Sequence, residues 1–238
     1  MNELISIKKA FENLVDCYEQ NILSNDLKVG YQHRKEMEIV FNNIAFKNNA
    51  MVLDIGCGVG TYTNPLTKKG CNVISIDFSK SMLKRTKERT EKQRISPLLV
   101  LASAGNLPFK NNYFDVVLCM EIFGHLPTSE IDKTVEEIKR VTKANGIIAT
   151  SIPSKIWFGL RKLITMNESS LEYGVEFNYF TISELPRKFG LPYKVQGIKV
   201  LPARLGKMCP SLWYFINSKL EHIPQICSYY VLIMKNLL

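Results

Sequence analysis

The sequence predicts an α/β fold, in which a doubly wound, mostly parallel sheet of seven strands carries an antiparallel edge strand, N-terminal helices and a lid insertion in its C-terminal half. Three observations lead to this prediction. Short β-branched runs alternate with longer polar runs of helical spacing, which is typical of βαβ units. A glycine-rich turn follows the first apolar run. The 238 residues, 46% of them hydrophobic, are enough for one sizeable core.

The first part of the chain predicts helices, and the middle predicts strands that alternate with helices. Helical spacing covers residues 3–22 and 32–45. Strands are expected at 51–55, 72–76, 97–102, 114–120 and 146–151. Helices are expected at 79–92 and 129–143, and the second has an apolar stripe that can lie against a sheet: Ile131, Val135, Ile138 and Val141.

The pattern becomes irregular after Ser151, where a cover over a substrate is expected. Aromatic residues gather in this loop-rich stretch: Trp157, Phe158, Tyr173, Phe177, Tyr179 and Phe180. A helix is expected at 181–189. Two further strands, at 193–201 and 228–234, are expected to pair antiparallel at the edge of the sheet.

Composition excludes several classes of protein. No apolar stretch approaches the roughly 18 residues of a membrane span, and the N-terminus lacks a signal peptide's apolar block. The six cysteines are scattered, with no Cys-x-x-Cys pair and no His at zinc-finger spacing. We therefore expect a cytoplasmic protein with reduced thiols, without disulfides and without a metal.

The residues most informative about function follow the first predicted strand. Asp54 lies near the end of that strand and Gly56-Cys57-Gly58-Val59-Gly60 follows, so the glycines fall in a strand-to-helix turn. There, glycines accept positive φ and approach a ligand closely, while the next helix, expected from Thr61, offers free N–H groups. A nicotinamide dinucleotide would favour Gly-x-Gly-x-x-Gly, but Thr61 stands at the third glycine position.

A second acid, Asp77, ends the next predicted strand, where a carboxylate can accept both hydroxyls of an adenosine ribose. Asp54 can either attract an ammonium or sulfonium group or brace the glycine turn. The alternative interpretation is that the glycines only form a tight turn, while Asp77 caps a helix beginning near Ser79. The order of these residues, at βαβ spacing, favours the ligand-binding interpretation.

Over residues 50–153 the chain resembles class I S-adenosylmethionine (SAM)-dependent methyltransferases, a Rossmann-like family, and within it the small-molecule branch of ubiquinone and menaquinone biosynthesis. The resemblance rests on the segments 52–60, 76–83, 104–109 with 114–117, and 121–127 with 140–146. It implies SAM as the cofactor, S-adenosylhomocysteine as the product and a SAM-binding core at 49–153. We expect a single domain over 1–238, in which a helical cover at 1–48, a lid at 154–190 and edge strands with an inserted segment at 191–238 surround this core.

The resemblance also implies which residues bind the cofactor: Asp54, Gly56, Cys57, Gly58, Gly60, Asp77, Phe78, Met82, Ser103, Ala104, Gly105, Asn106, Cys119, Met120 and, before the first strand, Arg34. The glycine loop would surround the methionine part, Asp77 the ribose, and Phe78 with Met82 the adenine. Arg34 would reach the methionine carboxylate, unless it is a solvated surface residue. Ser103 departs from the family, which usually has an acid there to accept from the adenine amino group.

Methyl transfer from a sulfonium is an in-line displacement, so the protein must chiefly align the acceptor with the methyl carbon and needs no covalent nucleophile. His125, beyond the fourth strand, is the candidate general base for a hydroxyl, phenol or acidic carbon. It could equally bind the cofactor or cap the next helix. Glu121 is interpreted as a cofactor-side or positioning acid, and His33 as a structural or solvated residue without a partner nearby in sequence.

The acceptor is expected to be a small molecule. Residues 154–238 hold eleven Lys or Arg and five Glu, and their aromatic residues resemble an interfacial segment that could contact a membrane surface transiently. A lipid-like or anionic acceptor fits: a quinone precursor, a lipid head group or a lipid-linked sugar. The basic run at 84–94 leaves an RNA-directed enzyme as an alternative, although interleaved acids disfavour nucleic acid. A regulatory SAM-binding protein and a nucleotide-sugar or NAD enzyme also remain open.

Overall fold

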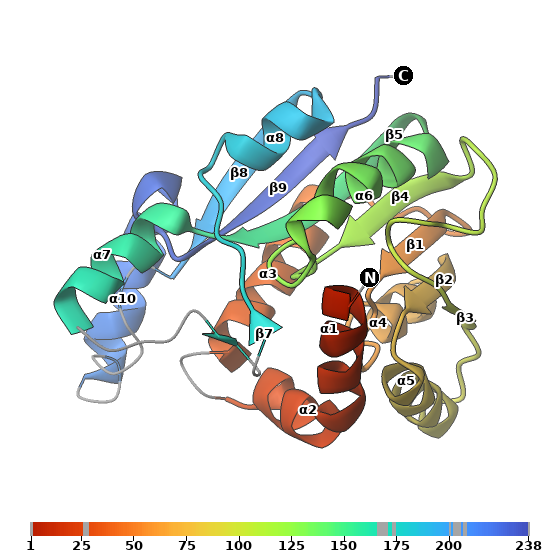
Figure 1. The fold of residues 1–238 in the computed structure, drawn as a ribbon, viewed down its shortest axis with the longest axis horizontal. Helices are drawn as coiled ribbons and strands as arrows, with labels where there is room; N and C mark the ends of the chain where they lie inside the picture. Colours follow the sequence, from red (N-terminus) through yellow and green to blue (C-terminus); the bar gives the residue numbers. More distant parts are fainter. Residues whose placement is uncertain are drawn as a thin grey trace.

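The computed structural model describes residues 2–25, 29–165, 171–172, 175–199, 201, 206 and 209–237. Its seven-stranded sheet has the order β3-β2-β1-β4-β5-β9-β8 (Figure 1). The strands are β1 (Met51–Ile55), β2 (Asn72–Asp77), β3 (Leu98–Leu101), β4 (Phe114–Cys119), β5 (Thr142–Pro153), β8 (Tyr193–Ile198) and β9 (Tyr229–Lys235). All the pairs from β3 to β5 are parallel, whereas β9 runs antiparallel to both β5 and β8. The predicted fold class is confirmed.

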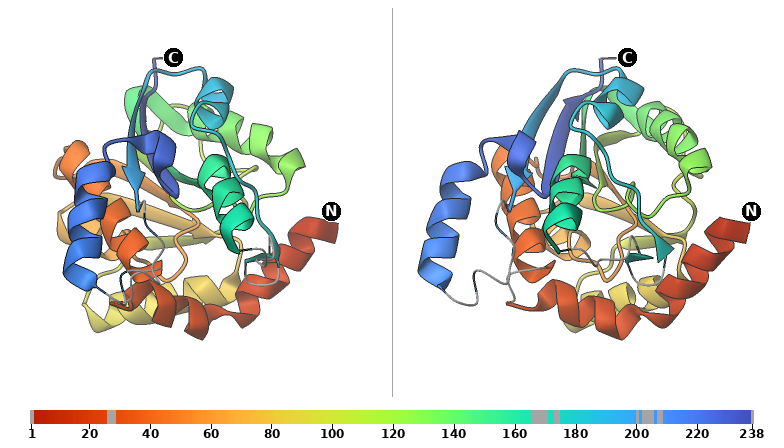
Figure 2. Two further views of the ribbon diagram at one scale, coloured as in Figure 1. Left: turned by 90° about the vertical axis from the view of Figure 1, so that its left-hand side faces the viewer. Right: turned by 60° about the vertical axis from the view of Figure 1, so that its left-hand side comes forward.

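The helices lie on both faces of the sheet and at one end of it (Figures 1 and 2). They are α1 (Asn2–Asn13), α2 (Val15–Leu23), α3 (Val29–Asn43), α4 (Thr63–Lys68), α5 (Lys80–Lys92), α6 (Thr128–Val141), α7 (Lys155–Thr165), α8 (Glu184–Phe189), α10 (Pro210–Leu220) and the short 3-10 helix η1 (Pro224–Ile226). Two short strands, β6 (Leu171–Glu172) and β7 (Val175–Glu176), form a separate hairpin.

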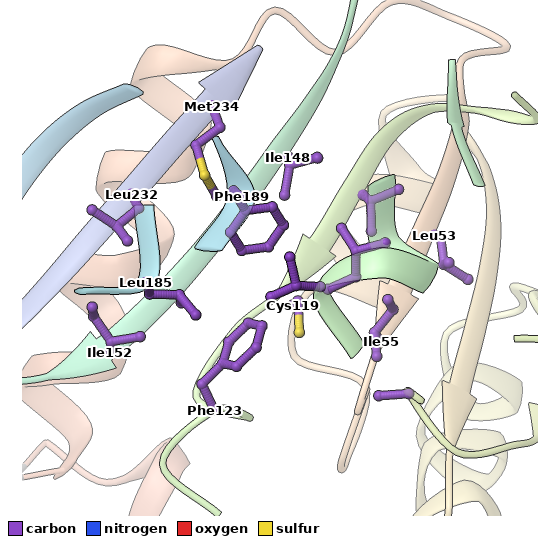
Figure 3. Packing of buried hydrophobic residues seen from close by; sticks show 14 of the residues in the cluster. Leu53, Ile55, Cys119, Phe123, Ile148, Ile152, Leu185, Phe189, Leu232 and Met234 are labelled. Carbon is purple, nitrogen blue, oxygen red and sulfur yellow. The ribbon is translucent and has the colours of Figure 1, made fainter. Parts of the chain in front are cut away.

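Two apolar layers hold the sheet between its helices. On one face, the predicted stripe of α6 packs on the strands together with Leu185 and Phe189 of α8, as Figure 3 shows for the α8 side chains. Phe189 meets Phe123 edge to face at 6.2 Å between ring centroids. On the other face, α3 and α4 pack with the fully buried Trp213 of α10. Each buried side chain of this size contributes roughly 1.5–3 kcal/mol of burial free energy, so the core fixes the positions of the strand ends.

The main differences from the sequence prediction lie after Ser151. The stretch predicted to be loop-rich begins with α7, whose Ser154 Oγ accepts a hydrogen bond from Trp157 N at 3.1 Å. Tyr173, one of the aromatic residues noted there, lies outside the described residues. The helix after the glycine turn begins at Thr63 and not at Thr61. Within the described ranges, no helix combines the length and apolarity that a membrane crossing requires.

Candidate functional site

A cavity lies at the carboxyl ends of β1, β2 and β4, where the glycine turn meets the N-terminal helices. About 740 Å³ of space lies between its walls, and this figure includes a part that is open to solvent. One wall, here called the strand-end wall, comes from the strand ends and the loops after them: Ile55, Gly56, Gly58, Ile76, Asp77, Phe78, Met82, Ala102, Ser103, Ala104, Met120, Glu121, Ile122, His125 and Leu126. The other wall, here called the α1–α2 cover, consists of Leu4, Ile7, Phe11 and Tyr18.

The glycine turn is built as its sequence requires. Gly56, Gly58 and Gly60 all have positive φ, at 64°, 52° and 78°. A Cβ on Gly56 would stand 2.2 Å from Ile122 Cδ1, and a Cβ on Gly60 would stand 2.8 Å from Thr86 Cγ2. Because side chains are strained in this backbone conformation and space is lacking, glycine keeps the turn open towards the cavity at Gly56 and tight against α5 at Gly60.

Asp77 joins the two sides of the site. Its Oδ2 accepts a hydrogen bond from Gly58 N at 3.0 Å, and its Oδ1 accepts one from Ser79 N at 2.8 Å. Ser79 is itself the N-cap of α5, since its Oγ accepts from Met82 N. The helix cap predicted as the alternative role of Asp77 therefore belongs to Ser79. Burial raises the pKa of Asp77 to about 6, so that it is ionised at neutral pH and lines the cavity.

Asp54 does not line the cavity. Its Oδ2 accepts a hydrogen bond from Thr63 Oγ1 at 2.7 Å, and Thr63 Oγ1 also lies 2.9 Å from Ser75 Oγ. Burial raises the pKa of Asp54 to about 6. Of the two roles predicted for this residue, the geometry matches bracing of the turn, because Asp54 holds the first residue of α4 in place.

The structure brings eight of the predicted cofactor-binding residues to the cavity: Gly56, Gly58, Asp77, Phe78, Met82, Ser103, Ala104 and Met120. Others shape it from behind. Cys57 is buried with its Sγ 4.0 Å from Thr86 Oγ1. Asn106 N donates to Ser103 O, which closes the turn that also contains Gly105. The carbonyl of Cys119 accepts from Thr150 Oγ1 at 2.7 Å, so this main-chain oxygen is already used within the sheet.

Arg34 lies outside the cavity, contrary to the role that the resemblance implied. Its side chain is exposed, and Nη1 donates to Ser24 O at 2.6 Å. The reason is helical geometry, since Gln32, His33 and Glu36 occupy the buried face of α3 and Arg34 projects from another face. The described part of the structure offers no arginine among the residues that line the cavity.

The α1–α2 cover was not among the predicted site residues. Ile7 and Phe11 are buried, and Phe11 meets Phe78 and His125 with ring centroids 6.1 and 5.1 Å apart. Glu12 fastens α1 to the start of α5, because its carboxylate accepts from Lys80 N at 2.7 Å and Ser81 N at 2.9 Å. Although partial burial opposes it, the hydrogen bonds from Ser81 and Lys80 lower the pKa of Glu12. An apolar stripe at helical spacing was the only sequence signal for this cover.

His125 faces the cavity between two aromatic rings. Its ring meets Phe11 on one side and Phe177, 4.7 Å away, on the other, both edge to face. Burial lowers the pKa of His125 to about 4, although the charge of Glu121 opposes the shift. The imidazole is therefore neutral at pH 7. The strand β7, which directly precedes Phe177, contacts α1.

A buried polar cluster lies behind the strand-end wall and corrects the prediction for His33. His33 Nδ1 lies 3.5 Å from Glu121 Oε2 and 3.9 Å from Glu36 Oε2. Gln32 Nε2 donates to Glu36 Oε1 at 3.2 Å and to Glu121 Oε1. Burial and the charge of Glu121 raise the pKa of Glu36. His33 therefore has two acidic neighbours, one of which lies 88 positions further along the chain and was out of reach of sequence spacing.

Comparison with known proteins finds a family that the middle of the chain resembles. A family model described as a methyltransferase domain matches residues 53–150. Over this stretch, which is less than half of its length, the chain is similar to a methyltransferase domain. This stretch contains the glycine turn, Asp77, the 103–106 turn and His125, which are the parts of the domain that meet at the cavity.

Relatives and solved structures are consistent with this assignment. The chain is 33% identical to the ubiquinone/menaquinone biosynthesis C-methyltransferase UbiE of Burkholderia vietnamiensis over 156 residues, which are 64% of this chain and 62% of that protein. It is 29% identical to an uncharacterized protein of Methanocaldococcus jannaschii over 179 residues, 75% of this chain and 68% of the relative. Among curated relatives, the chain spans about half to two thirds of their length.

The whole described fold also has a counterpart among solved structures. A SAM-dependent methyltransferase, possible histamine N-methyltransferase, from Thermotoga maritima superposes with a TM-score of 0.70 at 19% identity, covering 97% of this chain and 99% of that one. At this level of identity the likeness concerns the fold. It extends beyond residues 53–150 to the N-terminal helices and the strands β8 and β9.

Proposed function

We propose that this protein transfers the methyl group of SAM to a small-molecule acceptor and releases S-adenosylhomocysteine. The observation that carries the proposal is the cavity itself, in which the open glycine turn and the carboxylate of Asp77 share one wall with the apolar side chains of Phe78 and Met82. Such a wall offers a donor-rich turn, an acceptor for two hydroxyls and a surface for a flat base. These three features match the methionine part, the ribose hydroxyls and the adenine of SAM.

The residues at the cavity would hold the cofactor in the following way. Each oxygen of Asp77 already accepts one main-chain N–H, and its remaining lone pairs can accept the ribose hydroxyls. Phe78 and Met82 would pack on the adenine, with Ser103 and Ala104 at its edge, and the methionine part would lie along the glycine turn. Asp54, Cys57 and Cys119 would act from behind the wall, and Arg34 is no longer part of the proposed site.

The chemistry asked of the protein is alignment and proton removal. The acceptor's nucleophilic atom attacks the methyl carbon, the carbon–sulfur bond breaks, and the sulfur keeps the electron pair. His125, neutral and beside the cavity, would take the proton of a hydroxyl, phenol or acidic carbon. Burial raises the pKa of the Cys57 and Cys119 thiols, so neither is suited to be a nucleophile.

We propose a lipid-like or anionic acceptor: a quinone precursor, a lipid head group or a lipid-linked sugar. Support comes from α7 and α10. These helices follow β5 and β8, whose carboxyl ends lie at the same end of the sheet as the cavity. Apolar side chains are exposed on these helices and on η1: Ile156, Leu160, Leu212, Phe215, Ile223 and Ile226. Relatives at about 30% identity that act in quinone biosynthesis support the same choice.

The basic run on α5 is less suited to nucleic acid than its composition suggests. Arg85 pairs with Asp16 and with Glu19 of α2, and Arg89 Nη1 donates to Val59 O. Lys87 pairs with Glu91. These basic groups are engaged in holding α2 and the glycine turn, which leaves less free charge to track phosphates. An RNA-directed enzyme is therefore the weaker proposal.

Two measurements test the proposed function. Calorimetry should give micromolar dissociation constants for SAM and S-adenosylhomocysteine and no binding of NAD. Transfer of label from methyl-labelled SAM into a metabolite extract should then yield a labelled small molecule, and His125→Gln should lower the turnover without changing SAM affinity. SAM binding without any transfer would favour a regulatory SAM-binding protein, whereas binding of NAD instead of SAM would overturn the proposal.

A further inference from the structure

The buried polar cluster behind the strand-end wall has the composition of a metal site. His33 and Glu36 come from the buried face of α3, and Glu121 follows the end of β4. One nitrogen of His33 and one oxygen from each carboxylate lie within 4.8 Å of one another. Glu36 is fully buried, while Glu121 is part of the cavity wall and its side chain is 20% exposed.

The three side chains are oriented towards one another by neighbours that fix the opposite atoms. Gln32 Nε2 donates to the Oε1 atoms of both glutamates. This leaves the two Oε2 atoms facing His33 Nδ1, at 3.5 Å for Glu121 and 3.9 Å for Glu36. A second layer of hydrogen bonds that turns one ligand atom of each side chain to a common point is a regular feature of metal sites.

Unpartnered polar atoms around this point are an independent sign of a missing ligand. Over the residues that the structure describes, hydrogen-bond partners are lacking for His33 Nε2 and for the hydroxyl of Tyr62, neither of which is a proposed ligand atom. Tyr62 is 4% exposed, its ring lies 6.0 Å from that of His33, and its hydroxyl interacts with the charges of both glutamates. Buried polar atoms normally have partners, so these two atoms beside the cluster are consistent with a ligand bound there.

The charges in the cluster point to a cation. Glu36 and Glu121 bring two carboxylates into a buried place, and Lys199, itself 6% exposed, lies near enough to interact with the charge of Glu36. One ammonium group compensates one carboxylate. A bound divalent cation would compensate the second carboxylate in its ionised form.

We propose that His33 Nδ1, Glu36 Oε2 and Glu121 Oε2 bind one divalent metal ion of the zinc or manganese type, with an open position towards the cavity. One imidazole with two carboxylates suits these ions. Ligand atoms about 2.0–2.2 Å from such an ion lie roughly 3–3.5 Å apart, so the observed separations need only small side-chain shifts. No metal was expected from the sequence because cysteine pairs and zinc-finger spacing are absent, and this set of ligands contains neither.

The open position deepens the proposed function, on which this second part rests. Because Glu121 belongs to both the metal set and the cavity wall, the ion would bind an oxygen of the acceptor. A bound divalent ion lowers the pKa of such an oxygen and polarises it for attack on the methyl group. The acceptor class is then a molecule with a metal-binding oxygen, such as a phenol, carboxylate or phosphate.

The test titrates ZnCl2 and MnCl2 into chelator-treated, desalted protein, without SAM and without acceptor. We expect one ion per chain by calorimetry. Glu36→Gln, which keeps the size of the side chain, should weaken binding at least tenfold. Glu38→Gln is the matched control, because Glu38 lies on the same helix, is 56% exposed and pairs with Lys35. It should leave the affinity unchanged.

A second variant guards against a folding defect. If Glu36→Gln fails to fold by circular dichroism, His33→Gln is used, and the Co²⁺ absorption spectrum should change because a nitrogen ligand is lost. No saturable binding of either ion, or equal affinity in the folded ligand variants, would overturn the metal site. SAM affinity of the same samples is measured separately, so that a metal-binding protein without SAM binding sinks the proposed function alone, and the reverse result sinks the metal site alone.

Discussion

The two walls of the cavity are built by different physical means. In the strand-end wall, main-chain conformation and hydrogen bonds decide the geometry: three glycines with positive φ, and a carboxylate held by the N–H groups of Gly58 and Ser79. In the α1–α2 cover, four large apolar or aromatic side chains are held by packing and by Glu12. The strand-end wall therefore depends on the main chain and its hydrogen bonds, whereas the α1–α2 cover depends on side-chain packing.

The largest effect on SAM affinity is expected from loss of the Asp77 carboxylate in the strand-end wall. Asp77→Ala should weaken SAM binding by about 5- to 150-fold, because hydrogen bonds to a charged group contribute roughly 1–3 kcal/mol. Calorimetry measures this change. Asp132→Ala removes an acid that is exposed on α6 and paired with Lys188, and it should leave SAM affinity unchanged. Equal affinities in the two variants would contradict a ribose contact at Asp77.

The pH dependence of SAM affinity should follow the same carboxylate. Since burial raises the pKa of Asp77 to about 6, the free protein loses the acceptor form as the pH falls through 6, and binding at pH 5 should be about tenfold weaker than at pH 7. Asp54 also has a pKa of about 6 but lies outside the cavity. Calorimetry over pH 5–8 should show that Asp54→Asn keeps this dependence and that Asp77→Asn loses it.

The same shifts have an opposite consequence for folding. A carboxyl whose pKa is higher in the folded than in the unfolded state binds its proton more tightly when folded. The unliganded protein should therefore gain stability as the pH falls from about 6 towards 4, where Asp54 and Asp77 become protonated. Urea unfolding at both pH values measures this contribution, and a flat profile in Asp54→Asn/Asp77→Asn would assign it to these residues.

A smaller effect is expected when the cover is loosened. Glu12 caps the first turn of α5 from α1, and such contacts contribute roughly 0.5–2 kcal/mol. Glu12→Gln should therefore speed SAM release about two- to tenfold with little change in the association rate, as stopped-flow measurements can show. Glu3→Gln, on the exposed face of the same helix, is the control. An effect on association alone would mean that α1 is not a cover.

The sequence predicts the residues of the strand-end wall far better than those of the α1–α2 cover, for a physical reason. The glycine turn and Asp77 carry local signals, since a positive φ or a carboxylate at a strand end needs particular residue types at fixed spacing. Ile7 and Phe11 carry no such signal, because an apolar stripe looks alike whether it covers a cavity or a core. A helical cover at 1–48 was expected, but the side chains with which it lines the cavity are visible only when α1 is placed beside α5.

The direction of side chains and contacts between residues far apart in the chain could not be predicted from the sequence either. Arg34 has the residue type that suits a carboxylate, but its place on α3 turns it towards Ser24. Glu121 could be noted from the sequence, yet its meeting with His33 depends on how α3 packs on the sheet. The strands and most helices, in contrast, follow from periodicity alone. The helix α7 was not predicted, because Trp157, Phe158 and Gly159 obscure its helical spacing.

The smallest expected effect concerns the exposed apolar side chains of α7 and α10. Figure 1 shows both helices at the left-hand end of the molecule, and α7 contacts η1. Phe215 is 59% exposed, and Lys219 Nζ lies 5.9 Å from its ring, which combines an apolar and a basic contact as at a lipid surface. We propose that this surface touches an anionic membrane transiently while the acceptor is collected.

Phe215→Ser should therefore lower co-sedimentation with phosphatidylglycerol vesicles about threefold, because one partly inserted aromatic ring contributes only part of the roughly 1.5–3 kcal/mol of full burial. Leu98→Ser is the matched control, because Leu98 is 57% exposed on β3 at the opposite edge of the sheet. Equal losses in both variants would mean that general surface apolarity governs adsorption. A loss confined to Phe215→Ser would instead support the proposed contact between this surface and the membrane.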